Sequence, residues 1–347
     1  MRTLRLLFVA ALMVLALPAQ AHADPISTAI LAAVSITATT VGATAFAIIQ
    51  GVLTFALSTL ASIGLSYIAK AISGKPDSAA QQLGIKGTIQ LGGDLPRSFL
   101  VGYSATAGSL VYVNTWGQDG KTPNAYLTMV ISLSDLPITA LRQIWVNDVL
   151  VTWPGGGTAT SYGTPISEFS KDGKDYLWAK FCDGTQTAAD PWLTSQFGGD
   201  LNYPYSSGRI GKGVAYVIMT ARLNSDLFSG FPRFKFAGDG AKFYDPRKDS
   251  TAGGSGTHRF DDPSTWEFTL NPKVIEYNVL RGISFDGKWL YGLQSMTPSR
   301  LPTDSWFAAM NECDLLVDNS AGDQEPQYRC GAEVPVNMTP ADLIDAF

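Results

Sequence analysis

The chain has 347 residues, of which 16% are charged, and its formal net charge is −5. This low charge content excludes a coiled coil and a disordered charged tail, and the acidic balance argues against a sequence-specific nucleic-acid-binding surface. Three Cys and two His cannot supply a structural zinc site of the usual spacing, whereas 34 Gly and 19 Pro favour β-structure with many turns.

The first 24 residues have the pattern of a secretory signal. Arg2 and Arg5 precede an apolar run at 6–17, and small residues at 19–23 offer cleavage sites. Residues 1–24 are therefore predicted to be a signal-like hydrophobic leader.

Residues 25–74 form a second apolar segment, expected to be helical. No charged residue occurs between Ile26 and Ala69, and this stretch is long enough for two membrane crossings of about 20 residues each. It is also rich in Ala, Ser, Thr and Gly, which allow helices to pack closely. Two interpretations stay open: a membrane-inserting or transmembrane helix, which we favour, and a buried helical hairpin.

Residues 75–250 have the pattern of a β-rich domain. One strand is expected at 109–116, where Gly117 ends it, and another at 125–133, a near-continuous apolar run typical of a well-buried strand. The polar, Gly-rich and aromatic residues 155–211 interrupt this pattern and are predicted to be an insertion.

A hairpin turn is predicted between two further apolar runs, 141–146 and 149–153. Asn147 and Asp148 separate the runs, and both residue types tolerate the left-handed backbone that a tight turn requires. Further strands are expected at 214–223 and 233–236, so the sheet continues beyond the proposed insertion.

Helices are expected in the segment 251–347. Asn271 and Pro272 fit the N-cap and first position of a helix that runs to Leu280, with Gly282 just past its end. The order of strands followed by helices predicts an α+β, mainly β fold.

Two shorter helices are expected further along. Asp304 fits the cap of a helix that reaches Glu312, and Thr339 with Pro340 fits the start of another. The last helix has only about two turns before the sequence ends, and such short helices are marginal alone in water. We therefore expect the chain to be the N-terminal part of a longer polypeptide, with its second domain truncated.

Motifs that signal a cofactor or a catalytic nucleophile are missing from the sequence. There is no phosphate-binding Gly-rich loop between a strand and a helix, and no nucleophile elbow. His258 lies after the Gly-rich run 253–256, which is typical of a flexible loop, and is predicted to be an ordinary polar surface residue. We expect no cofactor, no metal, no catalytic residue and no enzymatic activity.

Carbohydrate binding or hydrolysis stays open as an alternative function. Carboxylates are plentiful enough for a glycosidase-like pair. Aromatic side chains are also available for a sugar site, although core packing is their commoner role in Gly-rich β-domains; these are Trp178, Trp192, Tyr203 and Tyr205.

The sequence Asp245-Pro246-Arg247 is predicted to be a structural motif. Proline favours extended geometry at Asp245, and Arg247 is placed to pair with a carboxylate or carbonyl at the end of a strand. A rigid exit from the β-domain is the favoured interpretation, with a ligand contact as the alternative. Cys313 and Cys330 lie 17 residues apart in the sequence, and their pairing in an exported chain is left open.

The order of these segments resembles the tail-tip hub, or tip attachment, proteins of bacteriophages with long non-contractile tails, a family also found in gene transfer agents. Each matching stretch is short, and the resemblance rests on their number and order over residues 85–347. The matching stretches are Asp94–Tyr103, Gly108–Tyr112, Ala125–Ile144, Trp145–Asp148, Gly213–Tyr216, Asp226–Pro232, Gly240–Arg247, Trp266, Asn271–Pro272, Ala308–Asp314 and Gln327–Cys330.

The resemblance implies a β-rich hub domain with an insertion, followed by the start of an α/β hub domain. It further implies a homotrimer at the virion tail tip that closes the tail tube and contacts distal tail or tail tube proteins. Receptor binding is implied for parts beyond the present C-terminus. The family pattern does not include an export signal, so we expect the leader and residues 26–69 to stay attached, shielded until they meet the host envelope membrane during genome delivery.

Two other functions compete with a structural virion hub. One is an exported, membrane-anchored β-rich protein of the cell envelope or periplasm, with carbohydrate binding as one form of this role. The other is a hydrolase that acts on peptidoglycan. Cleavage of the leader would favour the first, and a carboxylate essential for cell-wall lysis would favour the second.

Overall fold

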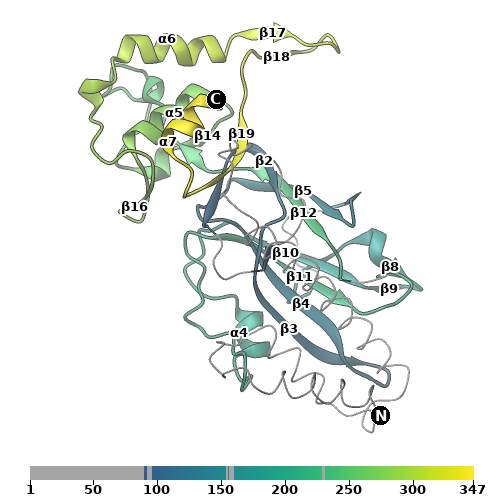
Figure 1. The fold of residues 1–347 in the computed structure, drawn as a ribbon. Helices are drawn as coiled ribbons and strands as arrows, with labels where there is room; N and C mark the ends of the chain where they lie inside the picture. The colour runs from purple at the N-terminus through teal and green to yellow at the C-terminus, as the bar shows by residue number, and fades with distance from the viewer. Residues whose placement is uncertain (1–89, 92–95, 154, 156–159, 229–230) are drawn as a thin grey trace, which may run out of the picture. The chain divides into compact units, whose positions relative to one another are not determined.

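A computed structural model describes residues 90–91, 96–153, 155, 160–228 and 231–347 (Figure 1). The predicted leader and the apolar segment Ile26–Ala69 lie outside the described residues. Within the described ranges the chain is mainly β with a few short helices, which confirms the expected fold class. None of the helices in these ranges is long and apolar enough to span a bilayer.

Two β-sheets dominate the described structure. A six-stranded sheet has the order β1-β3-β4-β11-β10-β7, and a five-stranded sheet has the order β19-β2-β12-β5-β6. The strands of the first sheet are β1 (Gln90–Leu91), β3 (Ser109–Asp119), β4 (Thr122–Ser134), β7 (Thr164–Pro165), β10 (Leu177–Cys182) and β11 (Ala215–Arg222). Those of the second are β2 (Ser98–Thr106), β5 (Ala140–Val146), β6 (Val149–Val151), β12 (Phe234–Asp239) and β19 (Gly331–Pro335).

The two sheets share one hydrophobic core. Met129 of β4 and Val217 of β11 belong to the same buried cluster as Ile144 of β5 and Phe236 of β12. Side chains alternate between the two faces of a strand, so only every second residue of each strand enters this core.

The strand β4 is buried on both faces, which explains its near-continuous apolar sequence. Its odd-numbered residues face the shared core, whereas Val130 belongs to a second cluster with Leu193 and Phe197 of helix α4 (Pro191–Phe197). Asp190 caps α4 by accepting hydrogen bonds from the first backbone N–H groups of the helix. The helix therefore covers part of the outer face of the six-stranded sheet.

The hairpin predicted at Asn147-Asp148 is confirmed, and the predicted stop at Gly117 is wrong. Asn147 and Asp148 have φ of 52° and 68° and connect β5 to β6. Gly117 has φ of 68° and lies at a register shift between β3 and β4, so the strand continues to Asp119. A glycine in the left-handed region absorbs the extra residue of a β-bulge without ending the strand.

The range 155–211 contributes strands as well as loops. It contains β7 and β10, which belong to the six-stranded sheet, together with α4 and the small hairpin β8 (Ser170–Lys171) and β9 (Lys174–Asp175). β10 pairs with β11 along its whole length. The range predicted to be an insertion therefore supplies strands of the six-stranded sheet.

The C-terminal part is built around a separate hydrophobic cluster. Its helices are α5 (Pro272–Arg281), α6 (Thr303–Cys313) and α7 (Pro340–Asp345). Three two-stranded ribbons accompany them: β13 (Lys242–Phe243) with β14 (Glu267–Phe268), β15 (Ile283–Phe285) with β16 (Lys288–Tyr291), and β17 (Leu316–Asp318) with β18 (Gln324–Pro326).

The starts of these helices follow the predicted caps in two cases out of three. Asn271 caps α5, and the Thr339 hydroxyl accepts a hydrogen bond from Asp342 N in α7. Asp304 was expected to cap α6, but the helix already begins at Thr303, and Pro302 is at the cap position. Asp304 therefore lies in the first turn, where its negative charge interacts favourably with the positive end of the helix dipole.

β2 lies between the two hydrophobic clusters. Leu100 faces the core shared by the two sheets, whereas Phe99 and Val101 belong to the C-terminal cluster. Ala332 and Val334 of β19 join Phe99 in that second cluster, and β19 pairs with β2 over five residues. A strand near the start of the described chain is thus bound to one near its end.

Candidate functional site

Asp245, Pro246 and Arg247 form a tight turn where the chain leaves β13. Asp245 is extended, with φ of −107° and ψ of 110°, and Pro246 begins a short 3₁₀ helix. The Asp245 carboxylate accepts hydrogen bonds from Arg247 N at 3.0 Å and from the Arg247 guanidinium at 2.7–3.2 Å. The extended geometry before proline and the pairing of Arg247 with a carboxylate are both as the sequence predicts.

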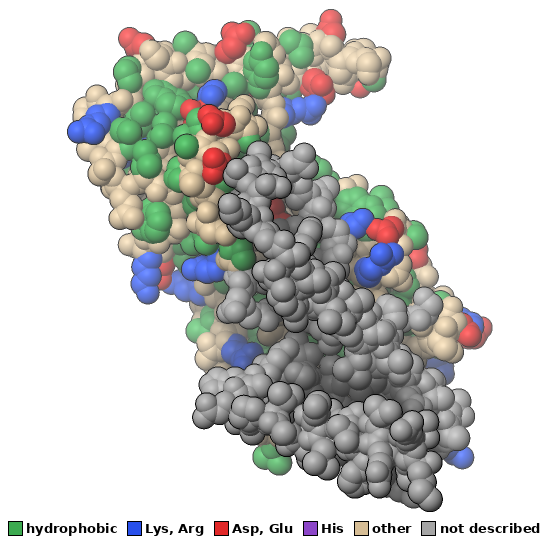
Figure 2. All heavy atoms as spheres, in the orientation of Figure 1, with side chains coloured by type: hydrophobic (Ala, Val, Ile, Leu, Met, Phe, Trp, Pro, Cys, Tyr) green, Lys and Arg blue, Asp and Glu red, His purple; other side chains and the backbone are tan. Residues whose placement is uncertain are grey.

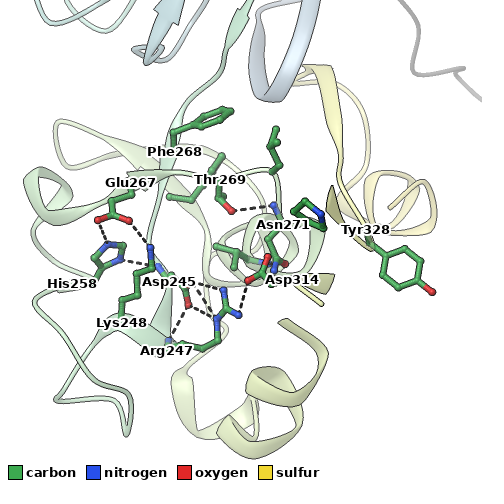
Figure 3. Close-up of a pocket in the computed structure, with 14 residues that line it drawn as sticks. Asp245, Arg247, Lys248, His258, Glu267, Phe268, Thr269, Asn271, Asp314 and Tyr328 are labelled. Carbon is green, nitrogen blue, oxygen red and sulfur yellow. Dashed lines mark hydrogen bonds and ion pairs between the residues drawn. The ribbon is translucent and has the colours of Figure 1, made fainter. Parts of the chain in front are cut away.

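Arg247 also connects this turn to helix α6. Figure 3 shows its guanidinium between Asp245 and Asp314, with Nη1 2.8 Å from Asp314 Oδ2 and 2.9 Å from Asn311 Oδ1. Burial alone would lower the pKa of Arg247, but its hydrogen bonds and charge pairing with Asp245 and Asp314 outweigh burial and raise that pKa. Arg247 therefore stays charged and holds two elements that are far apart in the sequence.

Asn271 makes a second connection to the same helix. Its Oδ1 accepts from Lys273 N at 3.0 Å and Val274 N at 3.2 Å, which is the expected N-cap of α5. Its Nδ2 donates to Met310 O in α6 at 2.8 Å. Asn271 is 4% exposed, so this one side chain satisfies buried backbone groups of two helices.

His258 is buried, and its prediction as a surface residue is wrong. It is 3% exposed, and its Nδ1 accepts a hydrogen bond from Asp245 N at 3.1 Å. In the neutral ring the proton is then on Nε2, which has no hydrogen-bond partner among the described residues and lies 3.9 Å from Glu267 Oε1. The histidine therefore supports the backbone of the Asp245 turn.

The Gly-rich run before His258, predicted to be a flexible loop, is hydrogen-bonded onto the turn that contains Arg247 and Lys248. Ser255 N donates to Arg247 O at 2.8 Å, and His258 N donates to Lys248 O at 3.0 Å. A Cβ on Gly254 would meet Arg247 O at 2.2 Å, so only glycine permits this approach. Close packing on the Asp245 turn explains both the glycines and the burial of His258.

Glu267 and Lys248 complete the charged lining of the site. They form an ion pair, and the hydrogen bond from Lys248 is the main reason that the pKa of Glu267 is lowered. The surrounding cavity has a volume of about 350 Å³. Figure 3 shows the charged side chains turned toward one another, whereas Tyr328 points away.

The arrangement is suited to holding elements together. The charged groups that line the cavity are paired with one another, and over the described ranges no three His, Cys, Asp or Glu side chains are grouped for a metal ion. The turn after β13, the end of α6 and the cap of α5 meet here. The sequence analysis did not assign Asn311, Asp314 or Glu267 to a site, although Asn311 and Asp314 lie within the resembling stretch Ala308–Asp314. No spacing signal indicates the contacts that these three residues make.

The remaining predicted residues fall outside this site. All three cysteines, Cys182, Cys313 and Cys330, are free thiols. Of the aromatic residues considered for a sugar site, Trp178 and Tyr205 are each 5% exposed and pack in the interior. Trp192 and Tyr203 are partly buried and pack against the cluster that contains Leu193 and Phe197 of α4.

Comparisons with known proteins give one distant likeness to report. No family model and no curated protein matches the chain. Among solved structures, a chain from the virion of a native gene transfer agent particle matches with 14% identity and a TM-score of 0.34. The match covers 53% of the present chain and 38% of that chain, and a likeness of this extent does not define a function.

Proposed function

We propose that the chain is a structural, non-enzymatic virion protein: the central hub of a phage-type tail tip. In this role it closes the tail tube and links the tube to receptor-binding parts. The proposal starts from the ordered series of residues that resembles the tail-tip hub family, since each of those stretches alone is short.

The observation that best supports it is where three of those residues lie. Asp245, Arg247 and Asn271 belong to the resembling stretches. Arg247, held by Asp245, links the turn after β13 to α6, and Asn271 links α5 to α6. A hub must keep its parts in fixed relation while it is held by several neighbours. Buried side chains that clamp distant elements serve that purpose.

The pairing of β19 with β2 supports the same role. It joins the end of the described chain to its beginning through five residue pairs, and each strand contributes to the cluster that surrounds α5. The two parts expected from the resemblance are thereby held in one scaffold. We expect a homotrimer of such scaffolds, in contact with distal tail or tail tube proteins.

The experiment that tests the proposal is removal of the gene from a producing cell, followed by electron microscopy of purified particles. The expected result is particles whose tails are missing or lack a closed tip, with normal tips restored by the wild-type gene. Restoration by an Arg247→Lys gene should be weaker, because lysine cannot reproduce the forked contacts of arginine. Normal tails in the absence of the gene would contradict the proposal.

A further inference from the structure

The ribbon β17–β18 and its flanks expose an unusual amount of apolar surface. We call residues 315–328 the apolar arm. Leu315, Leu316, Val317 and Tyr328 are 51%, 60%, 39% and 52% exposed. Figure 2 shows hydrophobic and acidic side chains together where Figure 1 places α6, β17 and β18. Exposed apolar side chains grouped in this way mark interaction sites.

The arm has no sheet partner of its own within the described chain. Among the described strands, β17 pairs with β18 alone, over three residue pairs. An isolated two-stranded ribbon is at best marginally stable in water, and both of its outer edges carry unpaired backbone groups. The arm is therefore expected to gain stability from a partner.

The arm is also acidic. It contains Asp318, Asp323 and Glu325 and no Lys or Arg. Arg329, just outside the arm, pairs with Glu325 at 2.6 Å. Asp318 and Asp323 are left without a basic partner within the described residues, so a basic surface would complement them.

The outer face of the five-stranded sheet has the complementary character. Lys235, Trp145 and Leu150 are cross-strand neighbours on that face, which we call the basic face. Leu150 is 50% exposed, and β6 is an edge strand of its sheet. Arg233 and Lys235 share the single carboxylate of Asp148, which leaves one basic charge uncompensated.

We propose that the apolar arm of one copy docks on the basic face of a second copy of this chain. Apolar and acidic side chains of the arm would meet apolar and basic side chains of the face, beside the open edge of β6. In a single chain the apolar side chains of the arm and Leu150 of the basic face stay exposed, so neither surface covers the other. The inference deepens the self-association included in the proposed function by naming its two surfaces.

The contact is heterologous, because it joins two different patches. Such contacts close into rings or continue into chains of subunits. Each copy then uses its arm once and its basic face once. This asymmetry provides the test.

The test measures self-association of the full chain by sedimentation velocity. Leu316→Ser removes an apolar side chain of the arm, and Leu150→Ser removes one of the basic face. Each variant should associate about tenfold more weakly than wild type, since one well-buried apolar contact is worth about that much. Leu201→Ser is the control, because Leu201 is 98% exposed and lies on neither surface.

Mixing the two variants gives the decisive result. The arm variant keeps an intact basic face, and the face variant keeps an intact arm. At a concentration at which each variant alone stays monomeric, an equimolar mixture should therefore form dimers and nothing larger, which also shows that both variants are folded. A wild-type chain that sediments as one copy, a Leu316→Ser variant that associates like wild type, or a mixture that stays monomeric would each overturn the inference. Presence of the chain in purified particles is a separate measurement, so failure here does not remove the proposed function.

Discussion

Gly102 of β2 and Gly331 of β19 are direct partners, and neither has room for a side chain. A Cβ on Gly102 would lie 1.9 Å from Cys330 O, and a Cβ on Gly331 would lie 1.9 Å from Tyr103 O. The two strands approach so closely because only hydrogen atoms lie between these backbones. This pair fixes the register in which β19 joins β2.

Alanine at either position should therefore destabilise the chain. Gly331 lacks a positive φ, so Gly331→Ala tests the steric effect alone, and we expect a loss of about 1–3 kcal/mol in the free energy of unfolding. Urea denaturation measures the loss.

Two matched controls distinguish the steric cost of the added Cβ from the cost of the backbone conformation. Gly199→Ala places a Cβ in open space without a positive φ and should be nearly neutral. Gly120 has φ of 59° and also has open space, so Gly120→Ala gives the conformational cost that Gly102→Ala shares. Equal losses at Gly331 and Gly199 would show that β19 does not pack on β2 in this way.

Replacing Arg247 should be costly because both of its carboxylate partners would lose their positively charged partner. Arg247→Met keeps the length of the side chain but leaves the buried Asp245 unpaired, and we expect a loss of about 3 kcal/mol in unfolding free energy. Lys212→Met is the control, since its pair with Asp286 is largely exposed and should contribute less than about 1 kcal/mol. Similar losses in the two variants would contradict the role given to Arg247.

Sequence reasoning predicted elements better than it predicted contacts between them. The hairpin at Asn147-Asp148 and the cap at Asn271 depend on neighbouring residues, and both were found where expected. The burial of His258 depends on Asp245 N and on the fold of the intervening Gly-rich run, neither of which has a local signature. Hydrophobic periodicity describes one face of a strand, but it does not say which strand will cover it.

The candidate site also shows this difference between features set by neighbouring residues and contacts between distant ones. The Asp245-Pro246-Arg247 turn was predictable because proline restricts the residue before it. Asp314 could not be foreseen as the second partner of Arg247, because 67 residues separate them and only the packing of α6 brings them together. The close approach of Gly102 and Gly331 could not be predicted either, because a glycine in the sequence does not indicate which backbone segment will pack against it.

Asp249 should make stability depend on acid pH. Burial would raise the pKa of Asp249, but hydrogen bonds from Thr251 and Tyr244, together with the charge of Arg259, lower it overall. A carboxyl group whose pKa is lowered by folding stabilises the chain above its unfolded pKa, near 4, and this stabilisation is lost as the pH falls through the folded pKa.

The pH dependence of Asp249→Asn isolates this effect. The difference in unfolding free energy between wild type and the variant should be full at pH 6 and should shrink below about pH 4. Urea denaturation at a series of pH values measures it. A difference that stays constant down to the lowest pH would show that the ionised form of Asp249 is not the stabilising one.

The thiols should react slowly while the chain is folded. Burial raises the pKa of Cys330 to about 12 and also raises those of Cys182 and Cys313. Because the thiolate is the reactive form, alkylation of Cys330 at pH 8 should be on the order of a thousandfold slower than in the unfolded chain. Mass spectrometry of samples quenched with and without urea follows each site. Rapid labelling of Cys330, which is only partly buried, would contradict its raised pKa.

The apolar N-terminal segment is expected to act in delivery and not in assembly. Apolar surface exposed to water costs about 25 cal/mol per Å², so an assembled particle should conceal it. Particles that carry a deletion of residues 1–74 should therefore assemble with normal tips but deliver their genome poorly. Transfer of a genetic marker to host cells measures delivery, and normal transfer would show that the segment is dispensable.

The most direct test of the central claim is to locate and count the chain in purified particles. Gold-labelled antibody against residues 96–347 gives its position by electron microscopy, and quantitative mass spectrometry against a capsid protein gives its copy number. The account predicts label at the distal end of the tail and the copy number of a single trimer per particle. Absence of the chain from particles, with recovery in the cell envelope fraction, would contradict it.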